Sequence, residues 1–180
     1  MNKIKLVFLV FSALIISLFS KSYVFALDEE VKDTQDIVVN SYEMFWPIVA
    51  GKVQGDSLYG LKLFKEKVRE ILIFSNFKKA DYNITISEKR IVEAEKLINE
   101  SRFEDAEKTL NRLNSSLSKV VNNIDLAEKS GIPVESLEER FNSSLERQSA
   151  LLSFLEMKLP EENKEILSSI TNQINNLLSE

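Results

Sequence analysis

From Leu58 onward, the apolar residues of this chain recur every three or four positions, and this spacing constrains the fold more than any other feature. Such spacing places apolar side chains along one side of an α-helix. Short breaks divide the pattern into separate helices at residues 75–76, 101–102, 130–133 and 159–160. Because short connections make neighbouring long helices lie antiparallel, the pattern predicts an all-α fold. We expect an elongated up-and-down antiparallel bundle of four to five helices with an irregular N-terminal arm.

Each predicted helix has an apolar side that we expect to face the core of a bundle domain, residues 58–180. The first helix begins near Leu58, with Asp56 or Ser57 placed to cap its first turn. Its inward positions are Leu58, Leu61, Phe64, Val68, Ile71 and Leu72. Inward positions of the later helices include Ile84, Ile91, Leu97, Leu110, Leu113, Leu117, Ile124, Leu145, Leu152, Ile170 and Ile174.

The N-terminus has the three parts of a secretory signal peptide. Lys3 and Lys5 supply positive charge, an apolar run follows over residues 6–19, and Val24-Phe25-Ala26 resembles a signal-peptidase site. About 20 apolar residues are needed to span a bilayer, so cleavage after Ala26 is favoured over an uncleaved anchor. Residues 1–26 are therefore the expected signal peptide. We expect an extracytoplasmic location, secreted or associated with the cell envelope, and no membrane span after signal cleavage.

Residues 27–57 form the predicted arm, which is acidic first and then rich in aromatic residues and glycine. Its run FWPIVAGKVQGDS holds the only tryptophan, Trp46, and Tyr42–Val49 is predicted to be extended. Tyr42, Phe45 and Trp46 have two interpretations: they cover the end of the bundle, which we favour, or they bind a sugar or peptide. With Tyr59 and Lys62, these three are the candidate partner-binding residues.

The absence of histidine and cysteine excludes several kinds of active site. Ser-His-Asp and Cys-His catalysis lack their base, and a zinc or copper site lacks its usual ligands. The acidic clusters at residues 93–95, 104–107 and 135–139 lack the spacing of a calcium loop, so we expect solvated helix faces. The sequence thus predicts a protein that is not an enzyme and holds no cofactor or metal. A carboxylate-dependent hydrolase remains an alternative that requires two acids in one cleft.

Charge is distributed unevenly along the chain. Residues 51–90 carry a net charge of +4, whereas residues 27–50 and 91–180 are acidic, with −5 and −7. An acidic chain argues against nucleic acid as the partner. The basic middle has two interpretations: it faces the acidic remainder of its own fold, or it meets an acidic polymer of the envelope.

Several motifs resemble those of a known family. Trp46-Pro47 precedes the motif Gly-Asp-x-Leu-Tyr-x-Leu-Lys at residues 55–62, and further blocks lie at residues 79–82, 89–97 and 151–177. Together they resemble an uncharacterised family of exported bacterial helical domains, described only as a domain of unknown function. Members often carry Phe-Asp-Pro where this chain has Phe74-Ser75-Asn76. The resemblance implies an extracytoplasmic helical domain and no established catalytic residues.

Two functions follow as expectations. The first is an exported, non-enzymatic helical interaction or scaffold module of the bacterial cell envelope, with an envelope protein or polymer as its partner. The alternative is an extracytoplasmic helical domain that senses a ligand or cation. The sequence leaves the oligomeric state open.

Overall fold

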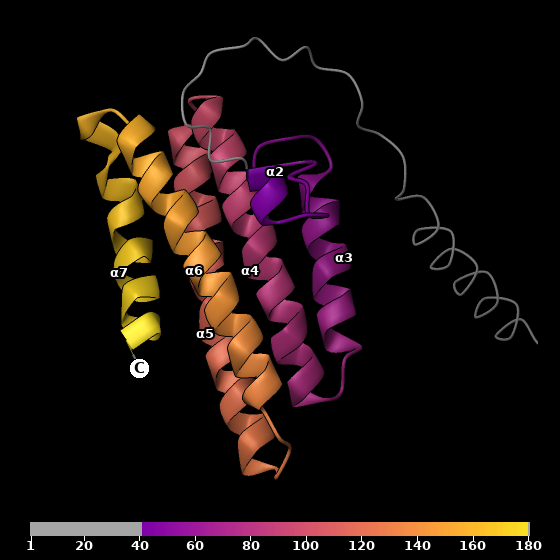
Figure 1. Ribbon diagram of the computed structural model, residues 1–180. Coiled ribbons are helices and arrows are strands. Elements are labelled where there is room, and N and C mark those ends of the chain that lie inside the picture. The colour runs from indigo at the N-terminus through magenta and orange to yellow at the C-terminus, as the bar shows by residue number, and fades with distance from the viewer. Residues whose placement is uncertain (1–40, 180) are drawn as a thin grey trace, which may run out of the picture. The chain divides into compact units, whose positions relative to one another are not determined.

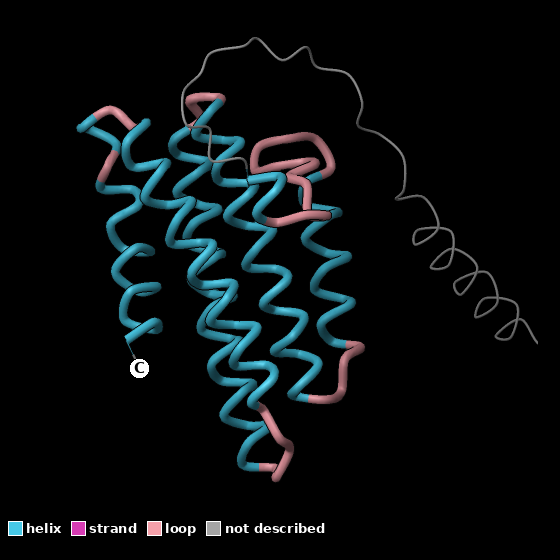
Figure 2. The backbone as a smooth tube through the Cα atoms, in the orientation of Figure 1, coloured by secondary structure: helices cyan, strands magenta, loops and turns pink. Residues whose placement is uncertain are grey.

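The computed structural model describes residues 41–179, which belong to one compact unit. The predicted signal peptide and residues 27–40 of the predicted arm lie outside the described residues. The described part is helical and contains no strand (Figures 1 and 2). Its elements are α2 (Ser41–Met44), α3 (Tyr59–Ile71), α4 (Asn76–Asn99), α5 (Phe103–Lys129), α6 (Glu135–Lys158), a short 3₁₀ turn η1 (Glu161–Asn163) and α7 (Glu165–Ser179).

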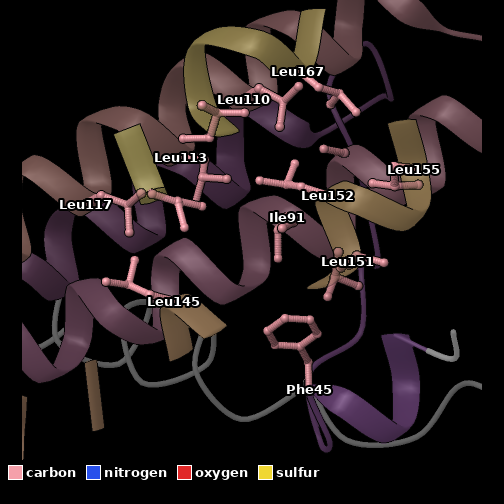
Figure 3. Close-up of a cluster of buried hydrophobic side chains, with 14 of the residues drawn as sticks. Phe45, Ile91, Leu110, Leu113, Leu117, Leu145, Leu151, Leu152, Leu155 and Leu167 are labelled. Carbon is pink, nitrogen blue, oxygen red and sulfur yellow. The ribbon is translucent and has the colours of Figure 1, made fainter. Parts of the chain in front are cut away.

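The predicted bundle is confirmed. The backbones of α4 and α5 lie close together, as do those of α4 with α6, α5 with α7 and α6 with α7. Leu110, Leu145 and Ile170 are buried between these helices, as their spacing predicted. Figure 3 shows Ile91 near the middle of the core, with leucines of α5, α6 and α7 around it. The apolar sides of α4 to α7 therefore face one another.

The predicted helix ends agree closely with the structure. The connection between α4 and α5 turns at Ser101, whose φ is 58°, and α5 ends before Gly131, whose φ is 75°. Glycine is favoured at such a position because it has no Cβ to clash in the left-handed region. The third predicted helix, with its last inward residue at Ile124, continues to Lys129.

Two predictions for the arm are wrong. Tyr42–Val49 is not extended, because α2 forms one helical turn over Ser41–Met44. This turn directs Phe45 into the core, where its ring lies near Ile91 and Leu151 (Figure 3). Neither Asp56 nor Ser57 caps α3 with its side chain; Asp56 Oδ2 instead accepts a hydrogen bond from the amide of Val53 at 2.9 Å. Phe45 and Val53 thus belong to the same core as the long helices.

The predicted inward side of the first helix is also wrong. Five of its six positions, Leu58, Leu61, Phe64, Ile71 and Leu72, are exposed. The backbone of α3 is not among the closely approaching pairs, and the helix reaches the bundle through long polar side chains. The reason is that two buried charged residues of α4, Glu93 and Arg90, need partners. Tyr59 and Lys62 bind Glu93, and Glu66 binds Arg90. The apolar side of α3 is therefore left outside.

Candidate functional site

The contact between α3 and α4 is built around a carboxylate with no exposed surface. Glu93 of α4 is 0% exposed and accepts hydrogen bonds from Tyr59 Oη at 3.0 Å and Lys62 Nζ at 2.5 Å. Arg90 Nη1 lies 2.8 and 2.9 Å from its two carboxylate oxygens. Arg90 is 4% exposed and also pairs with Glu66 of α3. We call these five residues the α3–α4 polar cluster.

Helical spacing explains how the cluster forms. Tyr59 and Lys62 lie three residues apart on α3, and Arg90 and Glu93 lie three apart on α4, so each pair shares one helix face. Lys62 also donates hydrogen bonds to the carbonyl oxygens of Ala50 and Lys52, at 2.9 and 2.8 Å. The same ammonium group therefore attaches both α3 and the loop before it to α4.

Burial and charge shift the acid–base properties of this region. Burial raises the pKa of Tyr59 to about 12, and the neighbouring Glu93 carboxylate adds to this shift. Burial lowers the pKa of Lys89, with Glu66 opposing that effect from 4.0 Å. For Arg90, burial lowers the pKa but the carboxylates of Glu93 and Glu66 outweigh it, so the net shift is upward. The upward pKa shifts thus extend to higher pH the range in which Tyr59 is neutral and Arg90 is charged, which suits the cluster to holding two helices together.

A second attachment holds the loop before α3. Arg102 forms ion pairs with Asp56 and Asp105, both at 3.1 Å, and donates to the carbonyl oxygen of Gln54. Gly55 has a φ of 84°, and a Cβ there would lie 2.5 Å from Arg102 Nη2. Glycine is therefore favoured at this position, because a positive φ strains a residue that has a Cβ.

Two hollows of the described surface lie near groups of charged side chains. One, of about 250 Å³, lies beside the α3–α4 polar cluster and is lined by residues of α3, α4 and α5 that include Glu66, Arg90 and Arg112. The other, of about 350 Å³, lies between α5, η1 and α7, and Glu107, Glu162 and Glu165 line it. Within residues 41–179, no three acidic, histidine or cysteine side chains are placed to hold a metal ion.

Among residues 41–179, the largest run of exposed apolar side chains follows α3 on the side away from α4. Leu61, Phe64, Ile71 and Leu72 are 51%, 65%, 64% and 61% exposed, and Val68 lies half-buried among them. We call these five residues the outer face of α3. Beyond them, Phe74 in the turn to α4 is 90% exposed. Scattered exposed apolar residues are ordinary, whereas a continuous row on one helix indicates a contact surface.

The five candidate partner-binding residues lie in three environments. Tyr42 and Trp46 are exposed and pack edge to face, with ring centroids 4.7 Å apart. Phe45 is 3% exposed in the core, and Tyr59 and Lys62 belong to the α3–α4 polar cluster. Of the five, Tyr42 and Trp46 are thus the ones that a partner can reach.

Glu93 and Arg90 were not among the predicted site residues. Glu93 was expected on a solvated helix face, and that expectation is wrong because α4 is covered by helices on several sides. The missed signal lies in α4 itself: Ile86 and Val92 occupy other sides of the helix than Ile84 and Ile91, and all four are buried. A helix that is apolar on more than one side is typical of a central position, where charged residues must be paired.

Most of the chain matches the model of one protein family. Residues 51–178 match the family model described as a domain of unknown function, DUF5667. The chain belongs to this family. The DUF5667 domain includes α3 to α7 and the whole α3–α4 polar cluster, and it begins after Trp46-Pro47. No curated protein and no solved structure matches the chain. Among the described helices, none is both long enough and apolar enough to cross a bilayer.

Proposed function

We propose that this DUF5667 protein is an exported, non-enzymatic interaction module of the bacterial cell envelope, and that it docks through the outer face of α3. The observation that carries the proposal is the orientation of α3. Its polar side is used for attachment to α4, through Glu93 and Arg90, while the large apolar side chains of its outer face point away from the bundle. Exposing apolar side chains to water is unfavourable, which supports a role in contact with another surface.

The rest of the molecule supports the same function. The core is complete without the outer face of α3, because its buried members come from the other helices and from Phe45 and Val53 of the loop region. The row of apolar residues on α3 is therefore not part of the buried core. The signal-like N-terminus supports an envelope location, where the DUF5667 domain would meet its partner.

The test is fractionation of the producing bacterium with a surface variant. A triple substitution, Leu61→Gln, Phe64→Gln and Ile71→Gln, removes most of the apolar character of the outer face. We expect the wild-type protein in the envelope fraction and the variant released from it, with an unchanged melting temperature. The matched control changes Val121, Leu126 and Met157, which are exposed on α5 and α6, to glutamine.

The possible results test the docking surface and the export of the protein separately. Retention of the control together with release of the α3 variant supports the docking surface. Equal retention of both variants would overturn it, and recovery of the wild-type protein in the cytoplasm would overturn export.

A further inference from the structure

We propose that the partner of the outer face of α3 is an anionic phospholipid surface, an inference that rests on the proposed function. The side chains exposed on this face are large and apolar, including Leu61, Phe64 and Ile71. A basic amphipathic helix with this composition is typical of segments that lie in the plane of a membrane interface. At about 1.5 Å per residue, the 13 residues of α3 would lie along the interface for roughly 20 Å.

The acidic and basic side chains of α3 lie on different sides of the helix. Its two acidic residues, Glu66 and Glu70, turn inward, where Arg90 and Lys119 neutralise them. At 3.6 residues per turn, Lys67 lies along one edge of the apolar row and Lys65 along the other. Arg69 lies beyond Lys65, where it is exposed and its guanidinium is also 5.4 Å from the centre of the Tyr82 ring of α4. The side of α3 that faces away from the bundle therefore carries basic residues and no acidic ones. This arrangement complements negatively charged headgroups on both sides of the apolar row.

The basic residues beside the apolar row continue past the end of α3. Lys78, in the first turn of α4, is exposed close in sequence to Phe74, which is 90% exposed. An aromatic side chain between basic residues favours the boundary between headgroups and acyl chains. The turn from α3 to α4 thus extends the same surface.

The form of this surface favours a lipid layer over a partner helix. Partner helices dock their apolar side into a groove. Neither of the two hollows described above is lined by Leu61, Phe64, Val68, Ile71 or Leu72. The outer face is instead the convex side of a single helix, which can enter a layer of headgroups without a complementary groove.

The test uses residues 27–180 and lipid vesicles. This chain keeps every described member of the core, which extends from Met44 to Leu177. We expect it to sediment with vesicles that contain phosphatidylglycerol but not with pure phosphatidylcholine vesicles. Leu61→Gln with Phe64→Gln and Ile71→Gln should abolish sedimentation, whereas the Val121, Leu126 and Met157 control should not.

Replacing Lys67, Arg69 and Lys78 by glutamine should weaken binding by about a hundredfold. The matched charge control replaces Lys108, Lys129 and Lys158, which are exposed on α5 and α6, by glutamine.

A fluorescent label identifies the face that enters the lipid. The chain has no cysteine, so Phe64→Cys and Met157→Cys each provide a unique attachment point for an environment-sensitive dye. Anionic vesicles should shift the emission of the dye at position 64 towards that of an apolar environment and leave the dye at position 157 unchanged.

Two results would overturn the proposal. One is failure of the wild-type chain to bind anionic vesicles, and another is equal binding by the α3 variant. If vesicles are not bound but release from the envelope still depends on α3, the docking surface stands and its partner is a protein or polymer. Dimerisation that the α3 variant abolishes, without vesicle binding, would assign the face to a second copy of this chain.

Discussion

Glu93 is the residue on which the attachment of α3 depends, because Tyr59, Lys62 and Arg90 all direct donors at its carboxylate. Glu93→Gln keeps the shape of the side chain but removes its charge, leaving Arg90 and Lys62 partly unpaired. We expect the free energy of unfolding to fall by about 3–5 kcal/mol, as is usual when one partner of a buried ion pair is removed. Urea denaturation measures this change, with the exposed Glu107→Gln as the control, which should cost less than about 0.5 kcal/mol. A loss below about 1 kcal/mol for Glu93→Gln would contradict the central role of this carboxylate.

Ionisation of Tyr59 makes the free energy of unfolding depend on pH in the alkaline range. Its pKa is raised from 10.0 to about 12, first by burial. Because the folded-state pKa lies above the unfolded one, the contribution of Tyr59 to stability is complete below pH 10 and is lost as pH rises to 12. The loss amounts to about 2–3 kcal/mol. Unfolding curves recorded from pH 9 to 12 should fall less steeply with pH for Tyr59→Phe than for the wild type. Parallel pH profiles would show that Tyr59 ionises without cost in the folded state.

At the scale of a single element, α3 and α5 illustrate opposite uses of the same periodic pattern. Leu117 of α5 is 0% exposed, whereas Phe64 of α3 is 65% exposed. We expect Leu117→Ala to lower the free energy of unfolding by about 2–5 kcal/mol, because it leaves a cavity in the core. Phe64→Ala should change it by less than about 0.5 kcal/mol. Chemical denaturation of the two variants measures the difference. Similar losses would show that α3 packs through its apolar side in solution.

This contrast also explains how far the sequence could predict the fold. The spacing around Leu110, Leu145 and Ile170 predicted both the helices and their buried sides, because each of those helices has apolar neighbours. The same spacing around Leu61 predicted the α3 helix correctly but its direction wrongly. Periodicity shows that a helix has two different sides, and it does not show which side another element will meet.

The candidate site was harder to predict for a related reason. Tyr59 and Lys62 were identified as candidates, but their contact with Glu93 joins residues 34 and 31 positions apart. No local pattern specifies such a contact. Phe45 was likewise placed in the arm, although its burial depends on where α4 and α6 leave space for a ring.

At the scale of the whole molecule, the structure has a tightly packed part and a more loosely attached one. The helices α4, α5, α6 and α7 pack through apolar side chains, whereas α3 is attached mainly by polar ones. Regions with few buried apolar contacts open with smaller free energies than the core. We therefore expect the backbone amides of α3 to exchange with deuterium faster than those of α4 and α5. Mass spectrometry of the exchanged chain measures this order.

A substitution in the α3–α4 polar cluster separates local opening from general loss of stability. Lys62→Gln removes the ammonium group that binds Glu93 and the carbonyl oxygens of Ala50 and Lys52. If α3 opens alone, exchange should accelerate in α3 and in residues 50–58 and stay unchanged in the middle of α5. If α3 opens only when the bundle unfolds, all helices should accelerate together, and α3 would be an integral part of the core. Local acceleration would mean that the surface proposed for docking can move while the bundle stays folded, because mainly polar contacts hold it in place.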